Sequence, residues 1–150
     1  MKPLNGIKVI DLTHMLAGPY AGMVIADLGA EVVKIEPLVT GEMTRGLLKT
    51  DPNYSYKEFG AYFLTLNRNK KSVSLDLKSE IGLEIFYELV KSADVVLNNF
   101  SAGVVKKLKI DFETLNNINP KIITCSITGF GETGPHSSCL LYTSDAADDL

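Results

Sequence analysis

Short apolar runs alternate with segments of helical periodicity along most of the chain, and this alternation limits the fold more than any other feature. Five runs are predicted to be strands: Lys8–Leu12, Glu31–Glu36, Ser72–Leu77, Asp94–Leu97 and Ile122–Ile127. Such alternation is typical of parallel sheets, because one parallel strand reaches the next only through a long crossover, which is usually a helix. The sequence therefore predicts an α/β fold with a Rossmann-like parallel sheet flanked by helices.

Start and stop signals place the helices between these strands. Gly29 is suited to end a helix that runs through Ala21–Leu28, and Asp111 can cap a short helix before the last strand. Ser79 is predicted to cap the clearest helix. The apolar stripe of that helix consists of Ile81, Ile85, Phe86, Leu89 and Val90.

Two long segments, Pro37–Ala61 and Thr128–Cys139, interrupt the alternation, and each begins just after a predicted strand. Open α/β sheets bind ligands outside the carboxyl ends of their strands, and long loops in compact domains are usually functional or mobile. A ligand site is therefore expected at that edge of the sheet.

Composition excludes several classes of protein. Hydrophobic residues make up 45% of the chain and charged residues 22%, as in globular domains. The formal net charge of −3 argues against a nucleic-acid partner. No apolar run reaches the roughly 18–20 residues of a membrane span, and the first residues lack a signal-peptide core, so we expect a cytoplasmic protein without a membrane partner. The two cysteines are not spaced as metal ligands, and neither a metal nor a disulfide is expected.

The end of the sequence differs from the rest. From Cys139 the letters CLLYTSDAADDL follow neither the alternation nor the composition of the preceding chain. We therefore predict one partial N-terminal domain over residues 1–138 and an anomalous, non-native tail over residues 139–150. Five strands without a closing element also indicate a truncated domain.

Two features at strand ends could hold a ligand, but each also has a plain structural interpretation. The small residues of the turn Leu16–Gly22 would let a ligand approach the backbone, although Pro19 removes one amide donor and a tight structural turn explains them equally well. Glu36 ends the second strand where a dinucleotide-binding fold places its ribose-binding acid. Without a GxGxxG motif, a solvated strand end is the simpler interpretation of Glu36.

Two polar clusters point to an anionic ligand with an extended chain. Arg68, Lys70 and Lys71 place three cations within four positions, which suits phosphate oxygens but is also common on solvated surfaces. Asn99 and Phe100 follow the fourth strand and could hold a base or an amide chain. An Asn-rich turn that caps the next helix is the alternative interpretation of this second cluster.

Taken in order, five segments closely resemble family III CoA-transferases, the CaiB/BaiF group that includes formyl-CoA and carnitine CoA-transferases. The resemblance extends from about Pro3 to about Pro135. It is carried by PLNGIKVIDLTHMLAGPYAGMVIADLGAEVVKIE, GEMTRG, YFLTLNRNKKSVSLDLKSEIG, ADVVLNNFSAG and NPKIITCSITGFGETGP.

The resemblance implies the N-terminal part of a longer enzyme that forms an interlocked homodimer. Such enzymes move CoA from an acyl-CoA donor to a free carboxylic acid through a covalent aspartyl intermediate, so CoA is a substrate and no tightly bound cofactor is expected. The nucleophilic aspartate is expected beyond this chain, so we assign it no catalytic residue and expect this polypeptide alone to be inactive.

Carried over by position, the resemblance also implies which residues contact CoA. Pro37 stands where some members have a basic contact, and Leu16 replaces a polar residue of formyl-CoA-type members. Together with the basic run, the expected contacts are Leu16, Ala17, Arg68, Lys70, Lys71, Leu75, Asp76, Leu77, Lys78, Asn99, Phe100, Ser101 and Lys107.

Two other classes of function remain open from the sequence. Glu36 and the alternating pattern also fit a nicotinamide-dinucleotide-binding oxidoreductase domain, which the missing glycine motif opposes. A noncatalytic fragment that folds poorly is the other class, because the dimer of the resembled family interlocks through segments that are absent here.

Overall fold

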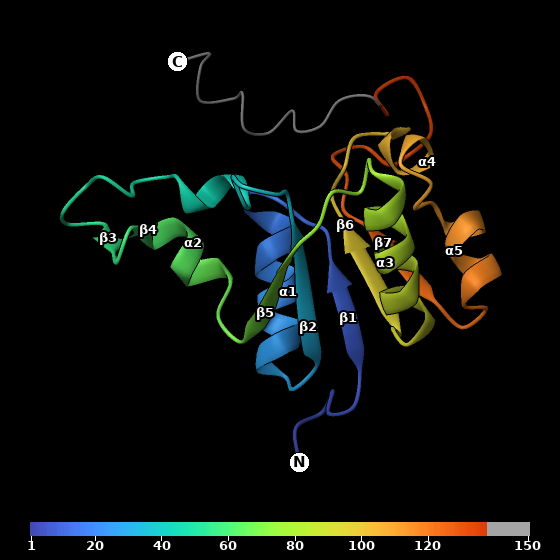
Figure 1. Cartoon of the computed structure of the whole chain (residues 1–150), viewed down its shortest axis with the longest axis horizontal. Coiled ribbons are helices and arrows are strands. Elements are labelled where there is room, and N and C mark those ends of the chain that lie inside the picture. Colours follow the sequence, from blue (N-terminus) through green and yellow to red (C-terminus); the bar gives the residue numbers. More distant parts are fainter. Residues whose placement is uncertain (138–150) are drawn as a thin grey trace.

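A computed structural model describes residues 1–137 of the chain and contains one parallel sheet of five strands. Along the sheet the strands are ordered β5-β2-β1-β6-β7 (Figure 1). They span β1 Lys8–Asp11, β2 Glu31–Glu36, β5 Lys70–Ser74, β6 Val95–Asn98 and β7 Ile123–Ser126. The predicted α/β fold with a parallel sheet is confirmed.

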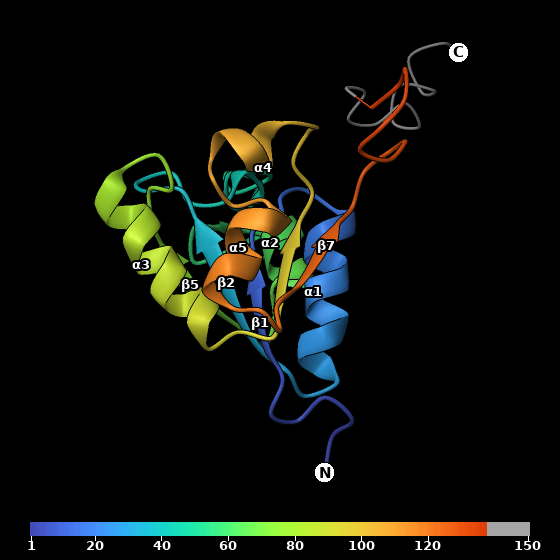
Figure 2. The ribbon, with the colours of Figure 1, turned by 90° about the vertical axis from the view of Figure 1, so that its right-hand side faces the viewer.

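Helices cover both faces of this sheet. Figure 2 shows α1 (Ala17–Asp27) on one side, and α3 (Glu80–Lys91) and α5 (Phe112–Ile118) on the other. Successive residues of a strand point to opposite faces, so Val9 packs in the α1 layer while Ile10 packs against the α3 and α5 layer. Both side chains are almost fully buried, because helices cover the central strand β1 on both faces.

The predicted capping residues agree with the structure, although α1 begins at Ala17, before the predicted start at Ala21. Gly29 has a φ of +106°, a left-handed conformation that a residue without a Cβ adopts at low cost. Ser79 Oγ accepts a hydrogen bond of 3.0 Å from the Gly82 amide, and Asp111 Oδ1 accepts one of 3.2 Å from the Thr114 amide. These two side chains cap α3 and α5.

The apolar stripe predicted for α3 is only partly correct. Phe86 and Val90 are fully buried, but 71% of Ile81 and 45% of Ile85 are exposed. The buried row runs through Gly82, Phe86 and Val90 at intervals of four residues, and Ile81 and Ile85 each lie one residue, or about 100°, around the helix from it.

The region between β2 and β5 contains more regular structure than the sequence indicates. It comprises the 3-10 helix η1 (Met43–Arg45), the hairpin strands β3 (Ser55–Tyr56) and β4 (Phe59–Gly60), and α2 (Ala61–Leu66). The third strand of the main sheet was predicted two residues late at its start and three at its end. It covers Lys70–Ser74, so Leu75–Lys78 form the turn that leads into α3.

One further helix, α4 (Val104–Lys107), lies between β6 and α5. Within residues 1–137, no helix has the length and apolar character needed to cross a membrane. The sequence-based boundary at residue 138 and the predicted anomalous tail lie outside the described residues.

Candidate functional site

The strand order creates one point in the sheet where successive connections leave in opposite directions. From β1 the chain continues through α1 to β2 on one side, and from β6 it continues through α4 and α5 to β7 on the other. β1 and β6 are neighbours, paired in register from Val9 and Val95. The loops after these two strands therefore diverge and leave a crevice at the carboxyl edge, where open α/β sheets bind ligands.

A cleft of about 450 Å³ lies at this edge. Residues that follow β1, β2, β5 and β6 line the cleft, so chain segments that are far apart in sequence meet there. Apolar side chains such as Leu12, Ile35 and Leu108 form much of its wall. Of the residues predicted from the sequence to contact a ligand, five line it: Leu75, Asp76, Leu77, Lys78 and Phe100.

The turn Leu75–Lys78 is held firmly at the cleft. The Leu75 amide donates to the Glu36 carbonyl at 2.9 Å, and Asp76 Oδ1 accepts from the Lys78 amide at 2.9 Å. The Asp76 carbonyl in turn accepts from the Ser79 amide and hydroxyl. Lys78 is exposed and forms no ion pair within the described part of the chain. Its ammonium group can therefore bind an anion.

Asn99 does not line the cleft and has a structural role beside it. Its Oδ1 accepts from the His14 amide, and its Nδ2 donates to the His14 carbonyl, both at 2.8 Å. The side chain thus joins the loop after β6 to the loop after β1. Phe100 continues into the cleft, where its ring lies 5.7 Å from that of His14.

His14 is a cleft residue that the sequence reasoning missed. Burial, followed by the nearby Lys34 ammonium, lowers the pKa of His14, so the imidazole is neutral near pH 7. It can then offer one donor and one acceptor nitrogen to a ligand. Its position just past the first strand was the only signal that could have indicated it.

Four other predicted contacts lie outside the wall of this cleft. Leu16 and Ala17 are exposed where α1 begins, next to the loop that carries His14. Ser101 lines separate hollows beside the loop of Gly129. Lys107 is exposed on α4, one residue before the cleft residue Leu108.

The basic run does not converge on the cleft, so the structure does not support the prediction that its three cations bind phosphate there. Arg68 pairs with Asp27 at 2.6 Å, and Lys71 pairs with Glu31 at 2.6 Å, both at the amino end of the sheet. Lys70 is buried beneath α1, where its ammonium contacts Asp11 and the Pro19 carbonyl, each at 2.8 Å. Each cation is already neutralised by a carboxylate.

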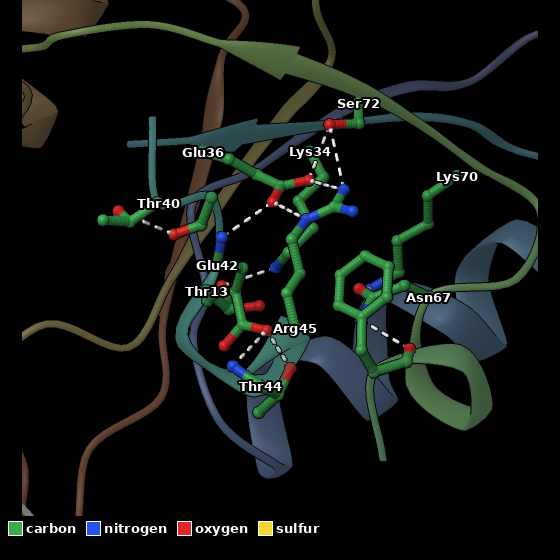
Figure 3. A network of polar contacts seen from close by, with 12 residues as sticks. Thr13, Lys34, Glu36, Thr40, Glu42, Thr44, Arg45, Asn67, Lys70 and Ser72 are labelled. Carbon is green, nitrogen blue, oxygen red and sulfur yellow. Dashed lines mark hydrogen bonds and ion pairs between the residues drawn. The ribbon is translucent and has the colours of Figure 1, made fainter. Parts of the chain in front are cut away.

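Glu36 belongs to a buried network of charges (Figure 3). It accepts from Arg45 Nε at 2.5 Å, Arg45 Nη2 at 2.7 Å and Ser72 Oγ at 2.6 Å. The Glu42 amide also donates to it at 2.7 Å. Glu36 is therefore not a solvated strand end, as the sequence favoured, and its oxygens are occupied.

The same network extends to the loop after β1. Glu42 accepts from the amides of Met15 and Thr44, both at 3.0 Å, and from the Thr44 hydroxyl. Lys34 donates to the Thr13 carbonyl at 2.6 Å. These contacts fix the loop after β1 against the loop after β2, and both loops contribute to the cleft.

The charge state of Glu36 predicts how stability changes in acid. Burial alone would raise the pKa of Glu36, but the hydrogen bonds from Arg45, Ser72 and the Glu42 amide outweigh it and lower the pKa from 4.5 to about 2. Because the folded-state pKa is depressed, this group stabilises the fold above pH 4.5, and the contribution is lost as the pH falls toward 2.

We therefore expect the free energy of unfolding of Glu36→Gln to depend less on pH than that of the wild type between about pH 5 and pH 2.5. Urea unfolding followed by circular dichroism at several pH values measures this slope. Equal slopes for the two proteins would contradict the assigned ionisation.

Fold and site together define the class of this chain: a Rossmann-like α/β domain with a ligand cleft at the switch point of its sheet. The chain belongs to CoA-transferase family III, whose profile matches residues 4–143. It is 42% identical to the formyl-CoA:oxalate CoA-transferase of Afipia carboxidovorans, over 94% of this chain and 32% of that protein. It is 44% identical to the succinyl-CoA:glutarate CoA-transferase of Mus musculus, over 91% of this chain and 30% of that protein.

A solved structure gives the same result. A CaiB/BaiF family protein from Brucella suis superimposes with a TM-score of 0.85 and 42% identity, over 94% of this chain and 37% of that one. The chain thus spans about a third of the length of the curated relatives named above. The resemblance recognised in the sequence is confirmed.

Proposed function

We propose that the cleft binds the CoA portion of an acyl-CoA, and that the complete protein transfers CoA from this donor to a free carboxylic acid. Family membership supports transfer of CoA in general. The observation that carries the proposal is that Leu75–Lys78 and Phe100 meet in one cleft, although Phe100 lies 22 positions beyond Lys78 in the chain.

The chemistry of the cleft suits this ligand. CoA combines an apolar, amide-bearing pantetheine arm with several phosphates. The apolar wall suits the arm, and His14 can hydrogen-bond an amide of it. Lys78 at the turn can pair with a phosphate, since ammonium–phosphate contacts are charge-assisted.

The covalent step of the proposed reaction needs a nucleophile, which we do not assign to any residue of this chain. In the proposed reaction an aspartate carboxylate attacks the thioester carbonyl, and CoA leaves as the thiolate, which gives a mixed anhydride. The thiolate then attacks the aspartyl carbonyl and releases the donor acid. This leaves CoA bound to the enzyme as an aspartyl thioester. The acceptor carboxylate attacks that thioester and expels the CoA thiolate, which gives a second anhydride. The thiolate then attacks the acceptor's carbonyl in this anhydride, which forms the new acyl-CoA and releases the aspartate carboxylate. We place the nucleophile beyond this chain, so the chain supplies CoA-binding residues and is inactive alone.

The interlocked homodimer and the cytoplasmic location form part of the same proposal.

The structure does not favour the oxidoreductase alternative. A dinucleotide-binding domain needs its strand-end acid to accept hydrogen bonds from a ribose. Here both Glu36 oxygens already accept hydrogen bonds from Arg45, and Ser72 and the Glu42 amide donate as well. A ribose would have to displace these donors.

Calorimetric titration of the purified chain with CoA tests the proposal. We expect saturable binding of CoA, and we expect Lys78→Gln to weaken it about five- to tenfold, because an exposed charge-assisted contact to phosphate is lost. Lys91→Gln is the matched control: Lys91 is also an exposed lysine, but it pairs with Glu88 at the far end of α3. Saturable binding of NAD that CoA does not displace would overturn the proposal.

A further inference from the structure

The loop of residues 37–42 forms part of the cleft, and its two ends are held by buried carboxylates. Pro37 and Leu38 line the cleft. Just before the loop, the Glu36 carboxylate accepts from the Glu42 amide and so joins the two ends of the loop. At the end of the loop, the Glu42 carboxylate accepts from the Met15 amide of the neighbouring loop. The exposed Leu38 is therefore held in place by contacts at the base of its loop.

Arg45 connects this base to the rest of the segment between β2 and β5. Its guanidinium makes two hydrogen bonds to Glu36 and lies 4.0 Å from the ring centre of Phe63 and 5.5 Å from that of Phe59. A planar fork that pairs with a carboxylate and stacks on rings is specific to arginine, and lysine cannot reproduce it.

Thr13, which accepts from Lys34, also donates its amide to Asp11, so the pair of Asp11 and Lys70 adjoins this network. The six charges then balance in number, but they differ in exposure. Asp11, Glu36, Glu42 and Lys34 are almost completely buried, and the side chain of Lys70 is 2% exposed. The side chain of Arg45 is 25% exposed. Arg45 is thus the member that can be changed with the least disturbance of the sheet beneath.

We propose that Arg45 is a positioning residue for CoA binding, because its paired contact with Glu36 holds Pro37 and Leu38 in the wall of the cleft. This inference rests on the proposed function. Arg45 does not line the cleft itself, so it acts on the ligand through the loop.

Arg45→Lys tests the role while it retains the positive charge. We expect the affinity for CoA to fall about tenfold, because the loop loses its bidentate anchor and the ring contacts. Arg45→Gln should weaken binding at least as much. Hydrogen exchange should accelerate at the Met15, Glu42 and Thr44 amides, whose acceptors belong to the network.

A double-mutant cycle separates positioning from general loss of stability. Leu38→Gly should weaken CoA binding in the wild type but have little further effect in Arg45→Gln, where Leu38 is no longer held in the wall. Val90→Ala is the control for stability: Val90 is fully buried in α3 and does not line the cleft. It should lower the urea midpoint and leave the affinity unchanged.

Each outcome decides the proposal. Unchanged CoA affinity in both Arg45 variants rejects the positioning role. Additive losses of affinity from Leu38→Gly and Arg45→Gln in the double variant also reject it. So does a loss of CoA affinity in Val90→Ala that equals the loss in the Arg45 variants. These results leave the proposed function intact as long as the wild type binds CoA. A wild-type chain that shows no CoA binding rejects the proposed function, and the positioning role with it.

Discussion

Replacement of Lys70 by methionine is expected to lower the free energy of unfolding by about 3–5 kcal/mol, since it leaves a buried carboxylate without its partner. The Lys70 ammonium lies 2.8 Å from Asp11, and the side chains are 2% and 0% exposed. Methionine fills similar volume but cannot neutralise Asp11, and the Pro19 carbonyl also loses its 2.8 Å donor. Urea unfolding at neutral pH, followed by circular dichroism, measures the loss.

The adjacent lysine provides a matched control on the same strand. The side chain of Lys71 is 70% exposed, and its partner Glu31 is 46% exposed, so Lys71→Met should change the free energy of unfolding by less than about 1 kcal/mol. The double variant Asp11→Asn with Lys70→Met should recover part of the loss, because the unpaired charge is removed. Similar losses for the two single lysine variants would contradict the assigned burial.

The contrast between these lysines shows why the basic run could not be interpreted from sequence alone. Arg68, Lys70 and Lys71 are neighbours in the chain, yet their carboxylate partners come from α1, β1 and β2. Which cation meets which acid depends on strand register and on helix placement over the sheet. Local sequence gives neither the register nor the helix placement. A cation that pairs with a carboxylate in the fold therefore cannot be distinguished in the sequence from a cation that binds a ligand.

The succession of strands and helices along the chain, in contrast, could be predicted because it depends on local patterns. Strand β2 has the predicted bounds, since an apolar run flanked by Gly29 and Pro37 leaves little freedom. The register of β5 could not be predicted in the same way. Lys70 lies where apolar periodicity does not favour a strand, and only its distant partner Asp11 explains its burial. The start of β5 was therefore predicted at Ser72, whereas the strand begins at Lys70.

The candidate site was predictable to the extent that the carboxyl edge of a parallel sheet collects the residues after each strand. That rule, together with the family resemblance, brought Leu75–Lys78 and Phe100 to one place. The rule did not indicate that both polar atoms of the Asn99 side-chain amide would hydrogen-bond to the backbone of His14. It also did not indicate that both carboxylate oxygens of Glu36 would accept hydrogen bonds from Arg45. Both depend on contacts between loops, for which sequence periodicity gives no information.

Gly82→Ala is expected to destabilise the chain by about 2–3 kcal/mol, although alanine normally stabilises a helix by about 1 kcal/mol relative to glycine. Gly82 is buried in the first turn of α3, where a Cβ would overlap the backbone carbonyl of Asp76 and lie 2.8 Å from Ser79 Oγ. A backbone carbonyl cannot rotate away as a side chain can, so the turn that precedes α3 must shift. Urea unfolding measures the loss of stability.

The displaced turn also lines the cleft, so the same substitution should weaken CoA binding at least tenfold under the proposed function. Gly46→Ala is the matched control, because the nearest atom to a Cβ there is 3.7 Å away and its φ of −82° suits any residue. It should leave stability unchanged or raise it by about 0.4–1 kcal/mol, since alanine restricts the unfolded chain. If Gly82→Ala instead stabilised the chain as an ordinary helix substitution does, the close approach of α3 to the Asp76 turn would be wrong.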